Sequence, residues 1–243
     1  MVKVIGRAKW KENQIKLFID TGDPEQIREA ASWGIIDGVT SNPTHAAKTG
    51  IPPKKLYPEI CKLVDGPVSL ETVGLTTEDM LREARILAAI ADNAVVKVPM
   101  TREGIVAVRQ LASEGIKTNV TVTFSPLQAL LAAKAGATYV SPFIGRLDAV
   151  GHRGMDVVEQ TLRIYDNYGF ATQVITASVR TPSHVLEAAL AGCHVCTVPF
   201  DILKQLYDHP LTDLGIKTFL DDWETVPDKD ELWQMEPELV SRR

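Results

Sequence analysis

Eight short runs of strand-forming residues alternate along this chain with segments of helical character, and this alternation constrains the fold more than any other feature. Each run is rich in valine, isoleucine or threonine and is bounded by turn-forming residues. Several runs lead into helix start signals, because Asp23-Pro24, Ser125-Pro126 and Thr181-Pro182 each combine an N-cap residue with a first-turn proline. We therefore predict strands at residues 15–20, 38–42, 67–73, 94–100, 117–124, 138–144, 172–179 and 193–199.

Strands that alternate with helices predict an α/β fold with a parallel sheet. Eight such units in about 210 residues describe a single-domain (β/α)8 TIM barrel, which we place at residues 15–223. A doubly wound nucleotide-binding sheet is disfavoured because the sequence lacks the glycine-rich phosphate loops of such folds. An open sheet of eight parallel strands is the alternative. We interpret residues 1–14 as an N-terminal extension and residues 224–243 as a C-terminal tail.

The composition excludes some classes of partner. The net charge is −5, and lysine and arginine form no cluster longer than a pair, so neither nucleic acid nor an anionic membrane is expected as a partner. No apolar stretch approaches the ~18 residues of a membrane span, and residues 1–14 lack the apolar run of a signal sequence. We therefore expect a cytoplasmic protein that binds a small molecule.

The three cysteines, Cys61, Cys193 and Cys196, are too few and too scattered for a disulfide framework, and they suit a reducing cytosol. Cys193 and Cys196 have C-x-x-C spacing. However, they lead into a predicted strand and lack a second pair of ligands, so we interpret them as buried structural residues. No metal site is predicted.

The strand predicted around Lys97 contains this lysine in the middle of a β-branched apolar run. The two-residue period of a strand places Lys97 on one face with Val95 and Pro99, and the remaining valines on the other face. An amine buried in a low dielectric loses its charge more readily, and the neutral amine attacks carbonyls. Lys97 is thus a candidate Schiff-base nucleophile. The alternatives are a lysine paired with a buried carboxylate and an edge-strand lysine that faces water.

Polar residues gather where the predicted strands end. In a (β/α)8 barrel these ends meet at one face, and that face carries the active site in barrel enzymes. A single polar strand end means little, but a lysine, carboxylates, amides, hydroxyls and arginines converging from seven strands predict an active site. The residues concerned are Asp20, Thr40, Ser41, Asn42, Glu71, Lys97, Asn119, Thr121, Thr123, Ser141, Arg146, Ser178 and Arg180.

The arginines indicate what kind of ligand binds. Ser178 and Arg180 lead directly into the predicted helix start at Thr181, so a hydroxyl, a guanidinium and helix N–H groups can meet one anion. Arg146, from the neighbouring strand, can reach the same oxygens. This pattern is typical of a phosphate site, which barrels often build after strands seven and eight. In the alternative interpretation Arg146 bridges to Asp148 and Arg180 is solvated.

Five of these segments together resemble the transaldolase family, and more narrowly its short-chain branch, which includes fructose-6-phosphate aldolases. The resemblance extends from about Lys16 to Trp223, in order and in spacing. The segments that carry it are residues 19–21 (IDT), 39–44 (VTSNPT), 95–101 (VVKVPMT), 141–148 (SPFIGRLD) and 177–180 (ASVR).

The resemblance implies a class I Schiff-base mechanism without a metal or an organic cofactor. Lys97 matches the family's nucleophile, and Asp20 matches the carboxylate that takes the C4 hydroxyl proton when the C3–C4 bond breaks. Glu71 matches a glutamate that acts through a water on the carbinolamine, and Thr121 matches the hydroxyl that holds this water.

The resemblance also implies how the substrate is bound. The groups that match binders of the dihydroxyacetone hydroxyls are Asn42, Asn119 and Ser141. The groups that match the phosphate grip are Arg146, Ser178 and Arg180. Thr40 and Phe143 complete the predicted substrate-binding set. The partners implied are therefore sugar phosphates.

Two residues bear on the choice between a transferase and a lyase. Fructose-6-phosphate aldolases carry glutamine and tyrosine where this chain has Glu71 and Phe143. Phenylalanine offers no hydroxyl to position water or to protonate the enamine, so the enamine is expected to persist until an acceptor aldehyde arrives. The prediction is a transaldolase that moves a dihydroxyacetone unit from sedoheptulose 7-phosphate or fructose 6-phosphate to glyceraldehyde 3-phosphate or erythrose 4-phosphate. A fructose-6-phosphate aldolase that releases free dihydroxyacetone is the alternative, and a non-catalytic sugar-phosphate-binding barrel is the third hypothesis.

A homo-oligomer is also expected from the resemblance. Short members of the family assemble as pentamer rings, often stacked into decamers, with a C-terminal helix that reaches a neighbour. The segment at residues 210–223 suits this role, and it suits equally well the last helix of the barrel itself.

Overall fold

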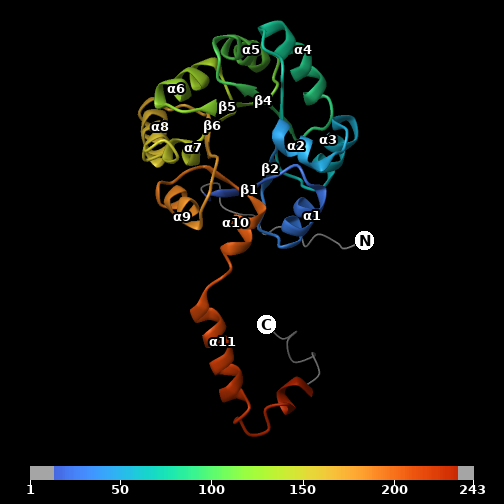
Figure 1. Ribbon diagram of the computed structural model, residues 1–243, viewed down its shortest axis with the longest axis vertical. Helices are drawn as coiled ribbons and strands as arrows, with labels where there is room; N and C mark the ends of the chain where they lie inside the picture. Colours follow the sequence, from blue (N-terminus) through green and yellow to red (C-terminus); the bar gives the residue numbers. More distant parts are fainter. Residues whose placement is uncertain (1–13, 235–243) are drawn as a thin grey trace, which may run out of the picture. The chain divides into compact units, whose positions relative to one another are not determined.

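The computed structural model describes residues 14–234. Eight parallel strands close into a barrel in which each strand pairs with the next and β1 pairs with β8, and helices surround the ring (Figure 1). This closure confirms the predicted (β/α)8 barrel and excludes the open sheet. The strands are β1 (Lys16–Asp20), β2 (Gly38–Thr40), β3 (Val68–Glu71), β4 (Ala94–Pro99), β5 (Thr118–Thr123), β6 (Tyr139–Pro142), β7 (Gln173–Thr176) and β8 (Val195–Val198).

The helices begin where the sequence predicts N-caps. The side chains of Asp23, Ser125 and Thr181 each accept a hydrogen bond from a backbone N–H in the first turn of the helix that follows. The helices are α1 (Pro24–Ser32), α2 (Pro43–Thr49), α3 (Pro53–Lys62), α4 (Thr77–Ala88), α5 (Arg102–Ser113), α6 (Pro126–Ala135), α7 (Ile144–Asp148), α8 (Met155–Tyr168), α9 (Pro182–Leu190), α10 (Phe200–Gln205) and α11 (Pro210–Trp223).

The interior of the barrel is closed by one apolar layer, which we call the barrel floor. It consists of five buried side chains that pack together, namely Phe18, Val95, Tyr139, Ile175 and Val195. A Cβ at Gly38 would lie 2.6 Å from the carbonyl oxygen of Pro67 and 2.8 Å from the Phe18 ring, so only glycine fits at this position of β2. The outward faces of the strands, including Val96 and Val98, pack in the larger core with the helices.

The two-residue period of the strands places a second layer directly above the barrel floor. Two residues after Phe18 comes Asp20, and two residues after Val95 comes Lys97. The same step leads to Ser141 on β6, Ala177 after β7 and Thr197 on β8. An apolar layer thus supports a mostly polar layer at the carboxyl ends of the strands.

Four predicted strands continue at least two residues too far, because β2 ends at Thr40, β3 at Glu71, β6 at Pro142 and β7 at Thr176. The error at β6 changes the setting of a site residue. The strand predicted at residues 138–144 ends at Pro142, and the short helix α7 follows it, so Arg146 lies on a helix rather than at a strand end. The reason is a change of direction after an isolated bridge between Phe143 and Ala177. There the backbone N–H groups of Ile144 and Gly145 donate to the carbonyls of Ala177 and Ser178, and the chain turns into α7.

The structure divides the chain at a point different from the predicted boundary. One unit ends at Leu203 and the second begins at Lys204, so α11 belongs to the second unit rather than to the barrel. Taken by itself, α11 has no buried residue. The apolar side chains that it exposes include Leu211, Leu214, Phe219 and Leu220. The predicted extension at residues 1–14 lies almost wholly outside the described residues, as does the end of the predicted tail.

No helix within residues 14–234 combines the length and the apolar character that crossing a bilayer requires.

Candidate active site

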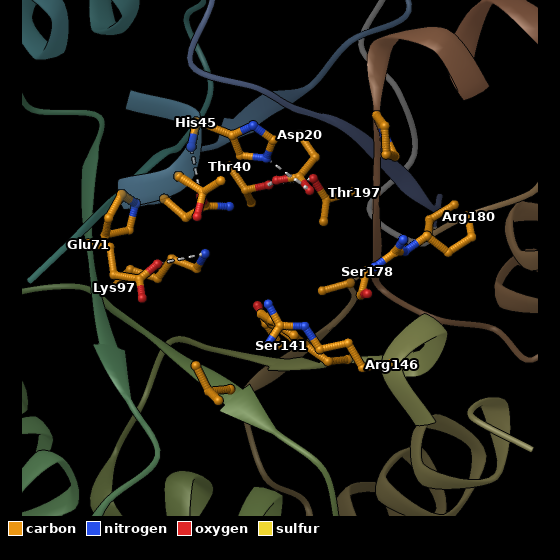
Figure 2. A pocket seen from close by; sticks show the side chains of 18 of the residues that line it. Asp20, Thr40, His45, Glu71, Lys97, Ser141, Arg146, Ser178, Arg180 and Thr197 are labelled. Carbon is orange, nitrogen blue, oxygen red and sulfur yellow. Dashed lines mark hydrogen bonds and ion pairs between the residues drawn. The ribbon is translucent and has the colours of Figure 1, made fainter. Parts of the chain in front are cut away.

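A cavity of about 500 Å³ opens at the carboxyl ends of the strands, above the barrel floor. Figure 2 shows that Lys97 and Glu71 lie on one side of it, Ser178 and Arg180 on the other, and Asp20 between them. Its lining includes most of the residues that the sequence predicts. These are Asp20, Thr40, Asn42, Glu71, Lys97, Ser141, Phe143, Arg146, Ser178 and Arg180.

Lys97 lies at the base of this cavity and is only 4 % exposed. Its Nζ is 3.1 Å from Oε2 of Glu71, which is the residue directly opposite it on β3, and it donates a 3.1 Å hydrogen bond to the carbonyl of Ser41. The strand β4 is paired on both sides, so Lys97 is not an edge-strand lysine. The amine is buried and aimed into the cavity, with a carboxylate in position to exchange a proton with it.

Asp20 lies across the cavity, and each of its carboxylate oxygens has a different neighbour. Oδ1 accepts a 2.7 Å hydrogen bond from the hydroxyl of Thr40, which in turn lies 2.6 Å from the Thr197 hydroxyl. Oδ2 faces Nε2 of His45 at 3.6 Å. These three neighbours come from β2, β8 and α2, so the position of the carboxylate depends on closure of the barrel between its first and last strands.

The electrostatic surroundings favour the ionised form of Asp20. Burial acts to raise the pKa of this carboxyl, but the His45 imidazole, the Lys97 charge and the Thr40 hydroxyl together outweigh it. The pKa of Asp20 is consequently lowered from its ordinary value of 3.8. Asp20 is therefore a carboxylate at neutral pH and is able to accept a proton.

The predicted amide Asn119 lies behind the wall of the cavity. Its Oδ1 accepts a 2.7 Å hydrogen bond from the Ser141 hydroxyl, and its Nδ2 donates to the Ser69 hydroxyl at 3.1 Å. Asn42 does line the cavity, but its Oδ1 caps α2 by accepting from the His45 N–H at 2.9 Å. Asn119 therefore orients Ser141, and Asn42 presents only its amino group as a donor.

β5 is irregular at the cavity. Its pairing with β6 shifts register between Val120 and Thr123, and Val122 adopts a φ of 58°. A β-branched residue rarely takes this left-handed conformation, so the bulge stores strain of about 1–3 kcal/mol beside the site. Val122 lines the cavity, whereas Thr121 is fully buried and its Oγ1 has no hydrogen-bond partner among the described residues.

On the side of the cavity that carries Arg146, Ser178 and Arg180, the start of α7 packs closely against the segment that follows β7. The Gly145 N–H donates to the Ser178 carbonyl, and a Cβ at Gly145 would lie 2.2 Å from that oxygen and 2.6 Å from Cγ of Arg180. Glycine thus lets the start of α7 pack under Arg180. Ser178 adopts a φ of 60°, and the Arg146 guanidinium lies 5.1 Å from the centre of the Phe143 ring.

Arg146 does not form the bridge to Asp148 that the sequence left open, whereas Arg180 is exposed to solvent, as the alternative interpretation expected. Within residues 14–234, Arg146 and Arg180 form no ion pair, and Asp148 contacts His184 at 3.3 Å instead. Both arginines line the cavity. Two positive charges without a carboxylate partner at one end of a concave site fit an anionic group such as a phosphate.

Among the lining residues that the sequence did not place in the site, four stand out, namely His45, Lys48, Val122 and Thr197. Thr197 was detectable, because it lies two residues beyond Val195 in a predicted strand, just as Lys97 lies two beyond Val95. The other three depend on the entry angle of α2 and on the bulge in β5, which leave no pattern in the sequence. Cys193 and Cys196, by contrast, are buried as free thiols.

Comparison with protein families agrees with this geometry. The family described as transaldolase/fructose-6-phosphate aldolase matches residues 17–241. The chain belongs to this family. The match covers every residue that the sequence places in the site and all of the strands except Lys16, the first residue of β1.

Curated members of the family resemble the chain closely. A probable transaldolase from Aquifex aeolicus is 59 % identical over 215 residues, which are 88 % of this chain and 99 % of that protein. A probable transaldolase from Thermodesulfovibrio yellowstonii is 57 % identical over 210 residues, which are 86 % of this chain and 98 % of that protein. The chain thus matches these family members over nearly their full length.

A solved structure outside the family supports the fold alone. The thiamine phosphate pyrophosphorylase from Pyrococcus furiosus aligns with a TM-score of 0.54 at 16 % sequence identity. The alignment covers 77 % of this chain and 87 % of that chain.

Proposed function

We propose that this protein is a transaldolase that transfers a dihydroxyacetone unit between sugar phosphates through a Schiff base on Lys97. The donors are sedoheptulose 7-phosphate or fructose 6-phosphate, and the acceptors are glyceraldehyde 3-phosphate or erythrose 4-phosphate. The observation that carries this proposal is the placement of Lys97. Its amine is buried at the base of the cavity 3.1 Å from Glu71, with an ionised Asp20 across the cavity.

The first half of the reaction makes the iminium. Lys97 gives a proton to Glu71, and its lone pair attacks C2 of the ketose. The proton that is then in excess on the nitrogen moves to the former carbonyl oxygen, which gives a neutral carbinolamine. Glu71 then returns a proton, through a water, to the C2 hydroxyl of the carbinolamine, which leaves as water. We assign Thr121 to this step because its buried Oγ1 has no hydrogen-bond partner among the described residues, and a water between this hydroxyl and the cavity would satisfy it.

The second half breaks and remakes a carbon–carbon bond. Asp20 takes the proton of the C4 hydroxyl, the C3–C4 bond breaks, and its electron pair neutralises the iminium nitrogen to give an enamine. The shortened aldose phosphate leaves. The enamine carbon then attacks the aldehyde of the acceptor, Asp20 returns its proton to the new hydroxyl, and hydrolysis frees Lys97. Protons and electrons balance without any external oxidant or reductant.

The anion-binding side supports a phosphorylated substrate. Arg146, Ser178 and Arg180 lie across the cavity from Lys97, and both guanidinium groups line the cavity. Charge-assisted hydrogen bonds from these groups hold the phosphate end of the sugar and place C2 over the amine. Ser141 and the amino group of Asn42 face the same space and suit the hydroxyls of the dihydroxyacetone part.

Phe143 favours transfer over release of free dihydroxyacetone. Its ring contacts Phe124 edge-on at 5.8 Å, lies beneath the Arg146 guanidinium and lines the cavity. The ring brings no hydroxyl to deliver a proton or a water to the enamine, so the enamine survives until an acceptor aldehyde arrives. Fructose-6-phosphate aldolase activity, with free dihydroxyacetone as product, is the second candidate, because the same Lys97 and Asp20 serve both reactions.

A homo-oligomer built on α11 belongs to the same proposal. A helix that exposes Leu211, Leu214, Phe219 and Leu220 needs a covering surface, and a pentamer or decamer of this chain would supply one. Light scattering that gives a monomer mass at working concentration would contradict this part. The three free thiols support action in a reducing compartment, the cytoplasm.

The proposal is tested by borohydride reduction in the presence of fructose 6-phosphate, followed by intact mass and peptide mapping. We expect a stable adduct confined to the peptide that contains Lys97, and none in Lys97→Ala, whose kcat should fall by at least about 1,000-fold. Added erythrose 4-phosphate should yield sedoheptulose 7-phosphate much faster than free dihydroxyacetone appears. An adduct that forms without Lys97 would show that the mechanism is wrong.

A further inference from the structure

His45 lies in the cavity wall, and the reaction proposed above gives it no role. It is the third residue of α2, its side chain is 22 % exposed, and its Nε2 lies 3.6 Å from Oδ2 of Asp20 (Figure 2). It also lines a second cavity of about 400 Å³, which shares Asp20 and Lys48 with the first. The imidazole therefore forms part of the wall between the reacting groups and a neighbouring space.

The two oxygens of Asp20 have different neighbours. Thr40 donates to Oδ1 at 2.7 Å, which fixes one side of the carboxylate. On the other side only His45 contacts Oδ2 among the described residues, and 3.6 Å is longer than a hydrogen bond. Catalytic hydrogen bonds are often long in the absence of substrate and shorten in the complex. A small rotation of either side chain closes this gap.

The backbone holds His45 and Asp20 close to each other. The His45 N–H donates to the Asn42 side chain at 2.9 Å, which fixes the first turn of α2. Gly22, two residues after Asp20, packs against the same turn, since a Cβ there would lie 3.0 Å from the His45 carbonyl carbon. The segment after Asp20 and the segment that carries His45 are thus in direct backbone contact, so the imidazole cannot easily move away.

We propose that His45 is a positioning residue that holds Asp20 for proton transfer at the C4 hydroxyl. This inference rests on the proposed function and deepens it. With Thr40 on Oδ1 and His45 on Oδ2, the plane of the carboxylate is fixed, and its remaining lone pairs face the substrate. His45 acts through Asp20 and does not itself contact the reacting atoms.

Several charged groups lie near Asp20, and together with burial they determine how the loss of His45 would change its pKa. Lys97 acts on Asp20 from β4, and Lys48 lines both cavities from α2. The carboxylates of Asp23 and Asp201 line the second cavity. Burial raises the pKa of Asp20, and His45 is the largest influence that lowers it. Loss of the imidazole therefore moves the acid limb of the kcat profile to higher pH, because burial is then less opposed.

His184 offers a matched control. It is the third residue of α9, as His45 is of α2, and both helices begin with a capping residue followed by proline. Its Nε2 lies 3.3 Å from Asp148, a carboxylate that does not line the cavity, and its Nδ1 accepts the Arg180 N–H. A change at His184 is therefore expected to act on substrate binding through Arg180 and to leave the acid limb of kcat unmoved.

The experiment compares His45→Leu, His45→Gln and His184→Leu with the native protein. The readouts are kcat and KM with fructose 6-phosphate and erythrose 4-phosphate from pH 3 to 9, a range that extends below the ordinary pKa of 3.8 for Asp20, together with borohydride trapping. We expect His45→Leu to lower kcat about tenfold with KM nearly unchanged, and His45→Gln, whose amide can still donate, to recover most of it. The acid limb should move up in His45→Leu. Trapping should persist in all three variants, because Lys97 and Glu71 are intact.

The outcomes separate the two proposals. If the native protein forms no adduct, the proposed function fails and this inference fails with it. If the adduct forms but His45→Leu keeps the native kcat and acid limb, the inference alone is wrong. If kcat falls equally in His45→Leu and His45→Gln while the acid limb stays in place, His45 has only a packing role, which also overturns the inference.

Discussion

The two ends of the cavity differ in how their charges are partnered. At the reacting end, Lys97, Glu71 and Asp20 are buried or partly buried, and each contacts a group of opposite charge or a hydrogen-bond partner. At the anion-binding end, Arg146 and Arg180 form no ion pair within residues 14–234, and Arg180 is exposed. The groups that must change protonation are held by partners, whereas the groups that must meet an anion lack one.

This difference separates two kinds of kinetic effect. Groups at the reacting end stabilise states in which a bond is forming or breaking, so their loss lowers kcat. Groups at the anion-binding end contact a part of the substrate that does not react, so their loss raises KM. Variants at the two ends therefore provide a direct test of the comparison.

Among variants that keep Lys97, the largest effect is expected from Asp20→Asn. Asparagine keeps the size of the side chain but cannot accept the C4 hydroxyl proton, so kcat should fall by about 100- to 10,000-fold. Borohydride trapping with fructose 6-phosphate should persist, because iminium formation does not use Asp20. Asp156→Asn, which changes an exposed carboxylate on α8 outside the cavity, serves as the control and should retain native kcat. Loss of trapping in Asp20→Asn would show that Asp20 is also needed for iminium formation, which would contradict its assignment to carbon–carbon bond cleavage alone.

A smaller effect, and one on binding, is expected from Arg180→Gln. Loss of a charge-assisted contact to phosphate should raise KM for fructose 6-phosphate by about 10- to 100-fold while kcat stays within about threefold. Steady-state kinetics with a phosphorylated and an unphosphorylated ketose measure this, and the unphosphorylated donor should be used equally well by both proteins. Arg109→Gln, on the exposed face of α5, is the control. A fall in kcat with KM unchanged would show that the two ends are not separate.

The smallest effect is expected on stability as a function of pH. The lowered pKa of Asp20 stabilises the folded state fully above the ordinary value of 3.8, and this contribution is lost as pH falls through the lower folded value. Urea unfolding of the native protein and of Asp20→Asn between pH 6 and 3 should therefore give a steeper loss of unfolding free energy in the native protein. Asp79 and Glu114, whose pKa values are also lowered, contribute equally to both curves. If the unfolding free energies of the two proteins fall in parallel with pH, the pKa of Asp20 is not lowered in the folded state.

Much of the fold followed from patterns that are local in sequence. Runs of β-branched residues and the capping pairs at Asp23, Ser125 and Thr181 identify strands and helix starts without any knowledge of the neighbours. The two-residue period then separates the face of Lys97 from the face of Val96 and predicts which side chains enter the barrel. The sequence alone therefore assigns residues from distant strands to one site.

The remaining features depend on contacts between segments, which the sequence does not encode locally. Arg146 reaches the cavity because two backbone hydrogen bonds to the strand next to it turn the chain into α7. Val122 enters it because the register of β5 shifts. His45 faces Asp20 because Gly22 lets the segment after β1 approach the first turn of α2. The roles of Asn119 and Thr121 in substrate binding and catalysis stay predictions, since both lie behind the lining residues.

The barrel floor has a consequence for the order of events. Phe18, Tyr139 and their neighbours close the barrel from below, so nothing enters or leaves the reaction cavity through the barrel axis. Each sugar must then pass the same mouth at the carboxyl ends of the strands. The first aldose phosphate must therefore leave before the acceptor can bind in its place. Donor and acceptor sugars are expected to compete for the same site.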